Sequence, residues 1–83
     1  MSSKYYTCIF KSFKNGYYTF VFEDGLEMVF EEIHPKILLK YDLKNDSKLR
    51  GNLFHLYFSE YMSDDEVDFV IYRIEYLELI NNK

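Results

Sequence analysis

The sequence is short of the residues that most often constrain or specialise a small protein. It has a single cysteine, Cys8, which excludes an internal disulfide and a cysteine-rich zinc site. It has three glycines and no glycine-rich phosphate loop. No apolar run approaches the length of about 18 residues that a membrane-spanning helix needs, and the first residues lack the apolar stretch of a signal peptide. Since a lone thiol fits a reducing compartment, we expect a cytoplasmic protein without a membrane partner.

Basic residues are also in deficit. The chain has 10 lysines and arginines against 14 aspartates and glutamates, which gives a formal net charge of −4. A basic patch is the usual mark of a nucleic-acid-binding protein, so this acidic balance disfavours that class and favours neutral or basic partners. The composition is rich in lysine, asparagine, isoleucine, tyrosine and phenylalanine, as in proteins encoded by AT-rich bacterial or phage genes, so we expect a bacterial source.

Apolar and aromatic residues are what the chain has in plenty. Nearly half of its 83 residues are hydrophobic, and nine tyrosines and eight phenylalanines make up 20% of it. This excludes disorder, and the length allows one domain, over residues 1–83, with one core. Each aromatic ring can bury about 150–250 Å², and so small a core has no room for all of them. We therefore expect part of the aromatic side chains on the surface.

Turn signals divide the chain into a run of short strands with one helix. Asn15-Gly16 and Asp24-Gly25 are hairpin signals between apolar β-forming residues. Pro35, after His34, ends the third strand and suits the first turn of a helix. The predicted elements are strands at residues 4–13, 17–22 and 26–31, a helix at 36–43, and strands at 53–61 and 68–79. The last strand is long enough to bend near Tyr76.

The register of the two hairpins decides which side chains share a face. Two-residue loops would place Glu27 and Glu31 among aromatic side chains, and an unpaired buried charge is costly. Three-residue loops that end at Gly16 and Gly25 avoid this, so we predict them. One face then collects, without a charge, Tyr6, Cys8, Phe10, Ser12, Tyr18, Phe20, Phe22, Leu26, Met28 and Phe30. The predicted core is completed by Phe54, Leu56, Phe58, Val70, Tyr72 and Ile74.

The order of these elements indicates a fold class. Three meandering strands, a short helix and two returning strands resemble the OB-fold, a five-stranded, partly open barrel. We therefore predict a mainly β protein with a small five-stranded OB-like barrel and one short helix. An SH3-like barrel, with the helix reduced to a single turn, is the alternative. Because OB-folds bind oligonucleotides, the resemblance implies single-stranded nucleic-acid binding as an alternative function, which the acidic charge disfavours.

The outward positions of the last two strands form the candidate site. The aromatic residues left for the surface or the edges are Tyr5, Phe13, Tyr17, Tyr57, Tyr61, Phe69 and Tyr76. If the strands at 53–61 and 68–79 pair, their outward side chains adjoin, and aromatic residues and arginine are typical anchors of protein interfaces. We predict a partner-binding surface made of His55, Tyr57, Phe69, Ile71 and Arg73. We predict a non-catalytic protein-interaction module, whose partner is another protein or a second copy of the chain. The alternative is that another segment of the chain itself covers this surface.

An acidic run lies between these two strands. It consists of Asp64, Asp65, Glu66 and Asp68. Because it lacks the alternating ligands and central glycine of a calcium loop, we interpret it as a solvated turn or a charged docking loop. Such a surface, together with Glu23 and Asp24, also supports another alternative, in which the small acidic domain mimics nucleic acid and inhibits a basic protein.

Catalytic residues are sparse. Cys8 is the only thiol and points to the predicted core, where a thiol is inert. His34 lies at a strand-to-helix corner, and His55 alternates with apolar neighbours and faces outward. Two histidines on separate elements make neither a metal site nor a nucleophile–base pair. We expect no enzyme activity, no bound metal and no cofactor.

Overall fold

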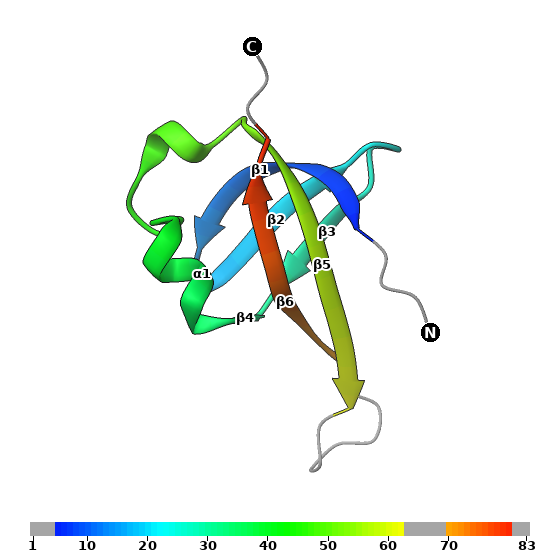
Figure 1. The fold of residues 1–83 in the computed structure, drawn as a ribbon. Helices are drawn as coiled ribbons and strands as arrows, with labels where there is room; N and C mark the ends of the chain where they lie inside the picture. The colour runs from blue at the N-terminus through cyan, green and yellow to red at the C-terminus, as the bar shows by residue number, and fades with distance from the viewer. Residues whose placement is uncertain (1–4, 63–69, 81–83) are drawn as a thin grey trace.

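Alternating apolar and polar residues build one continuous sheet. The computed structural model describes residues 5–62 and 70–80, and within these residues it contains a six-stranded sheet and one short α-helix (Figure 1). The elements are β1 (Tyr6–Lys14), β2 (Tyr17–Phe22), β3 (Glu27–Phe30), β4 (Glu32–Ile33), α1 (Pro35–Lys40), the 3₁₀ turn η1 (Ser47–Leu49), β5 (Leu53–Met62) and β6 (Val70–Leu79). The prediction of a mainly β protein with one short helix is confirmed.

The expected third strand is divided in two. β3 pairs antiparallel with β2, whereas β4 pairs parallel with β6, and only Glu31 separates β3 from β4. The strand order is β3-β2-β1-β5-β6-β4. The short stretch of chain that contains β3 and β4 therefore supplies both edge strands of the sheet. The described strands do not close into a barrel. The sixth strand arises because the chain bends at Glu31 and changes its pairing partner.

The hairpin between β2 and β3 has the predicted three-residue loop. The Gly25 N–H donates to the Phe22 carbonyl at 2.8 Å, and the Phe22 N–H donates to the Leu26 carbonyl at 2.8 Å. Gly25 has a φ of 87°, the left-handed conformation that this type of loop requires. The Asp24 carboxylate accepts a hydrogen bond from the Leu26 N–H at 3.0 Å and stabilises the turn.

The prediction of a three-residue loop between β1 and β2 is wrong. Lys14 pairs directly with Tyr17, which leaves the two-residue loop Asn15-Gly16. Both residues have positive φ, 55° and 86°, as a type I′ turn requires. Asparagine followed by glycine is the sequence best suited to this turn, and here the local preference decided the loop.

A bulge restores the predicted register further along the same hairpin. The register shifts between Phe10 and Ser12, so that Phe10 still lies opposite Phe20, as predicted. Between the bulge and the turn, the side chains of β1 lie on the opposite faces of the sheet from those predicted. Phe13, expected at the surface, packs beside Tyr18 with ring centroids 4.8 Å apart, and Ser12, expected on the core face, does not join the core. The bulge places the charge of Lys11 in solvent without disturbing the aromatic face.

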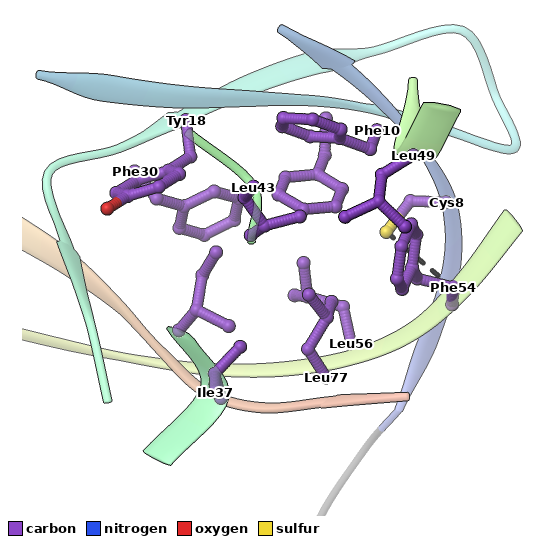
Figure 2. Close-up of a cluster of buried hydrophobic side chains, with 12 residues drawn as sticks. Cys8, Phe10, Tyr18, Phe30, Ile37, Leu43, Leu49, Phe54, Leu56 and Leu77 are labelled. Atoms are coloured by element: carbon purple, nitrogen blue, oxygen red, sulfur yellow. Dashed lines mark hydrogen bonds between the residues drawn. The ribbon is translucent and has the colours of Figure 1, made fainter. Parts of the chain in front are cut away.

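The core lies between the two halves of the curved sheet (Figure 2). Its buried members are Cys8, Phe10, Tyr18, Phe20, Phe30, Ile37, Leu43, Leu49, Phe54, Leu56, Ile74 and Leu77. Two predicted core residues, Leu26 and Val70, are instead 56% and 42% exposed. Leu26 follows the β2–β3 turn directly, and Val70 lies at the far end of the β5–β6 hairpin. β1 pairs with β5 only from Leu53 to Leu56, so it does not reach that far end.

A second bulge lies in the β5–β6 hairpin, close to the bend foreseen near Tyr76. Tyr57 pairs with Tyr76, but the next residue, Phe58, pairs with Ile74, so Glu75 is the extra residue. The alternation of β6 therefore changes phase at Glu75. Ile74 and Leu77 both point into the core, and Tyr76 comes to lie opposite Tyr57 on the outer face.

The segment between β4 and β5 covers one end of the core. α1 starts with Pro35 in its first turn, and the His34 Nδ1 atom accepts a hydrogen bond from the Lys36 N–H at 3.1 Å. The helix ends at Lys40, earlier than the predicted residue 43, because Tyr41 turns to an extended conformation. The Tyr41 hydroxyl accepts a hydrogen bond from the Leu79 N–H at 2.9 Å, which fastens the end of α1 to β6.

Candidate functional site

The outer face of β5 and β6 brings together most of the residues predicted to bind a partner. The outward pairs are His55 with Glu78, Tyr57 with Tyr76, Ser59 with Arg73, and Tyr61 with Ile71. His55 is exposed, while Tyr57, Ile71 and Arg73 are half-buried. Phe69, the fifth predicted residue, lies outside the described residues. The hairpin pairing on which the prediction depended is therefore present.

Three tyrosine rings form a cluster on this face, which we call the tyrosine cluster. Tyr5, just before β1, has its ring centroid 5.9 Å from that of Tyr57 and 5.3 Å from that of Tyr76. Tyr5 is 54% exposed and Tyr76 is 38% exposed. Edge-to-face contacts of this kind order the rings while leaving much of their surface to solvent. Of these three tyrosines, sequence reasoning placed only Tyr57 in the site. It predicted a bend near Tyr76, but not that the bulge at Glu75 brings Tyr76 to the outer face.

Carboxylates border the tyrosine cluster. The Tyr76 hydroxyl donates a hydrogen bond to Glu78, and this bond raises the pKa of Tyr76 to about 12. The phenol therefore keeps its proton, and continues to donate to Glu78, up to a higher pH than a free tyrosine would. Tyr5, His55, Tyr76 and Glu78 line a shallow hollow of about 270 Å³ on the surface. This hollow combines ring faces with a negative charge.

Arg73 is held by carboxylates of its own chain. Its Nη1 atom lies 3.7 Å from Glu32 Oε1, and its Nε atom lies 3.4 Å from Glu75 Oε2. The same two carboxylates accept hydrogen bonds, at 2.6 Å each, from the hydroxyls of Tyr61 and Ser59 respectively. The bond to Glu32 raises the pKa of Tyr61. Because two carboxylates face one guanidinium, this part of the outer face is acidic overall.

The remaining candidate residues have structural positions. Burial raises the pKa of the Cys8 thiol to about 12, and its Sγ atom lies 3.9 Å from the Phe54 carbonyl oxygen, which confirms the predicted core position. His34, predicted at a strand-to-helix corner, caps α1. The acidic run Asp64, Asp65, Glu66 and Asp68 lies outside the described residues. Over residues 5–62 and 70–80, no three histidine, cysteine, aspartate or glutamate side chains are close enough to hold a metal ion.

Two further findings concern membrane-spanning helices and similarity to known proteins. No helix in the described part of the chain is both long and apolar enough to cross a bilayer. Comparison of the chain with protein-family models, with curated proteins and with solved structures gives no match.

Proposed function

We propose that this chain is a non-catalytic protein-binding module whose partner docks on the outer face of β5 and β6. The observation that carries the proposal is the tyrosine cluster, in which Tyr5 and Tyr76 keep 54% and 38% of their surface exposed although they contact one another. Aromatic rings held rigidly at a surface contribute large contact area at a small entropic cost, which is why they are common interface anchors.

The charges around the cluster favour a basic partner. Glu78 adjoins Tyr76, and the positive charge of Arg73 is offset by Glu32 and Glu75. Tyrosine rings attract arginine and lysine through their negative faces, and nearby carboxylates reinforce this attraction. A second copy of the same acidic face would bring like charges together. We therefore favour a different protein that presents arginine or lysine side chains, and place both in the cytoplasm.

We also propose that the fold is OB-like. The helix lies between the third and the fourth long strand, as in the predicted order. The short stretch that contains β3 and β4 pairs with β2 on one side and with β6 on the other, as it would in a barrel that is partly open. α1 has six residues, more than the single turn that the SH3-like alternative assumed.

The nucleic-acid alternatives find less support. OB-folds bind oligonucleotides on the face of their second and third strands, where β2 and β3 present Val21 and Val29. Lys11, on the neighbouring β1, is engaged by Glu27 at 2.7 Å. The acidic-inhibitor hypothesis depends mainly on residues 64–68, which lie outside the described part, and otherwise on the β2–β3 turn.

A titration with a basic peptide tests the proposed function. We expect an octa-arginine peptide to shift the amide NMR signals of β5 and β6 around the tyrosine cluster, and an octa-glutamate peptide to shift none. Tyr76→Thr keeps a strand-forming residue but removes a ring, and should weaken binding about tenfold. Tyr17→Thr removes a tyrosine that is 42% exposed at a different place, the start of β2, and should weaken binding less than about twofold.

Two outcomes would contradict the proposal. Equal effects of Tyr76→Thr and Tyr17→Thr would show that the peptide responds to net charge alone. A rise in mass with concentration in light scattering, reversed by Tyr76→Thr, would assign the face to a second copy of this chain instead of a basic partner.

A further inference from the structure

Among the described residues, the core is open at the end where β1 begins and β2 meets β3. A hollow of about 450 Å³ lies at this end, and nine described residues line it. Its floor is made by the side chains of Tyr6, Phe22 and Phe58, with Met28 beside them. All four were predicted as core residues, yet each is only half-buried, since no described element lies over them. We call this site the aromatic hollow.

The three rings of the aromatic hollow support one another. The centroid of Tyr6 lies 5.2 Å from that of Phe22 and 5.6 Å from that of Phe58, and Phe22 and Phe58 are 6.4 Å apart. Behind them, Phe30 is fully buried and packs against Phe58 at 5.3 Å. Phe58 is therefore fixed from behind and Tyr6 and Phe22 pack against it, so the outer surfaces of the three rings form a wall that is already in place before a ligand arrives.

The charged residues at the rim have one sign. Glu23 and Asp24, from the β2–β3 turn, are the two charged side chains among the nine described residues that line the hollow. The Leu26 N–H donates to Asp24 Oδ1 at 3.0 Å, which fixes the position of that carboxylate. An anion would be repelled here. A neutral apolar ligand would cover the carboxylates without offering them a partner, which is costly.

We propose that the aromatic hollow binds an organic cation with a quaternary or methylated ammonium head. Ring faces attract such a group electrostatically, its methyl groups replace water against the rings, and the two carboxylates balance its charge. The volume lies within the range of about 300–1,000 Å³ that is usual for small-molecule sites. The ligand is either a free compound or a methylated lysine of another protein, and both share this chemistry. Tyr5 lines this hollow and also belongs to the tyrosine cluster, but the three rings and two carboxylates that carry this inference lie outside the outer face of β5 and β6.

The first experiment separates charge from shape. The protein is titrated, with detection by amide NMR shifts, against choline and against 3,3-dimethylbutan-1-ol, in which carbon replaces the charged nitrogen. We expect choline to bind about tenfold more tightly, with shifts at the β2–β3 turn and the start of β1. A peptide with one trimethyllysine is the third probe. If it binds much more tightly than choline, the source is a protein side chain, and equal binding assigns a free ligand.

The second experiment uses variants with a matched control. Glu23→Gln combined with Asp24→Asn keeps the turn hydrogen bond and removes both rim charges, and it should weaken choline binding about fivefold to tenfold. Glu27→Gln combined with Glu31→Gln changes the net charge equally, outside the hollow, and should have little effect. Phe22→Leu keeps an apolar side chain but removes a ring face, and should weaken binding in a protein that thermal unfolding shows to be folded.

Three results would overturn the inference. In the first, the uncharged analogue binds as tightly as choline. In the second, the control pair weakens choline binding as much as the rim pair does. In the third, the mass in solution rises with concentration and Phe22→Leu reverses the rise, which would assign the hollow to a second copy of this chain.

Discussion

The two ends of the core are built from the same kinds of residue, and yet the side chains at one end are more deeply buried than those at the other. At the end that α1 and η1 cover, Ile37, Leu43 and Leu49 pack into the core and keep 9% of their surface or less (Figure 2). The end by the β2–β3 turn lies on the opposite side of the molecule from α1 (Figure 1). There, Tyr6 and Phe22 remain half-buried. We call these the covered end and the open end.

The difference shows how an apolar residue acquires its role. Phe54 at the covered end and Phe22 at the open end both lie on the core face of a strand. Phe54 meets the Tyr41 ring, which is 5.5 Å away, and is fully buried. Phe22 meets its neighbours Tyr6 and Phe58 but keeps a solvent-facing surface. Coverage by a distant segment therefore buries one ring completely and leaves the other partly exposed to solvent.

The largest effect on the free energy of unfolding is expected when the rings of Phe54 and Phe22 are removed in separate variants. Phe54→Ala should lower the free energy of unfolding by about 3–5 kcal/mol, because a fully buried ring leaves a cavity. Phe22→Ala should cost about half as much, since part of its ring already faces water. Chemical denaturation monitored by circular dichroism measures both. Equal losses would show that the open end is closed in solution.

A second pair of variants tests whether α1 acts as a lid by its buried face alone. Ile37→Ala, in the middle of α1, should cost about 2–4 kcal/mol because Ile37 is 6% exposed. Leu39→Ala, on the same helix but 88% exposed, should change stability by less than about 0.5 kcal/mol. A large loss with Leu39→Ala would mean that something covers the other face of α1 in solution.

The thiol of Cys8 reports on the core between the two ends. With a pKa raised from 9.0 to about 12, the folded protein holds the thiol proton at a pH where the unfolded chain loses it. Rising pH therefore favours the unfolded chain between about pH 9 and 12, and stability is lost over this window. Denaturation at several pH values should show this slope, and Cys8→Ala should reduce it.

Tyr18, Tyr61 and Tyr76, whose pKa values are also raised, contribute to the same slope, so only the difference in slope between the parent protein and Cys8→Ala is assigned to Cys8. At pH 8, a disulfide reagent should modify Cys8 at least about a hundredfold more slowly in the folded than in the unfolded protein. Rapid modification in the native state would indicate that solvent enters the core from the open end.

The smallest effect on stability concerns the N-terminal cap of α1, at the covered end. His34→Ala removes the side chain that accepts from the Lys36 N–H and should cost about 1 kcal/mol, whereas His34→Asn should retain most of the cap. Thermal unfolding is sensitive enough to compare the two. If both variants lose the same stability, His34 stabilises through packing and not through its hydrogen bond.

The hairpins show where prediction from the sequence succeeded and where it failed. The β2–β3 loop followed from the placement of Glu27 and from Gly25, whose φ of 87° suits a three-residue loop. The β1–β2 loop was mispredicted because the prediction allowed for no bulge. The bulge beyond the turn lets a two-residue loop at Asn15-Gly16 coexist with the pairing of Phe10 and Phe20. Bulges add one residue at a position that no local pattern marks, so register beyond a turn is harder to predict than the turn itself.

The candidate site shows the same division. Alternation placed His55 and Tyr57 on the outer face of the β5–β6 hairpin, because period-two patterning is a local property of a strand. It missed that Tyr5 and Tyr76 join Tyr57, since one comes from outside the strand and the other depends on the bulge at Glu75. It also assigned the rings of the aromatic hollow to the core, where they are only half-buried.

The amino-acid sequence by itself determined the class of this protein, the sites of its turns and the apolar face of each strand up to its bulge. These features depend on steric and hydrophobic preferences that act within a few neighbouring residues. Only the tertiary structure decided which end of the core is covered and that β4 runs beside β6. Both depend on contacts between segments about forty residues apart, such as Tyr41 with Leu79 and Glu32 with Arg73, whose formation no local pattern specifies.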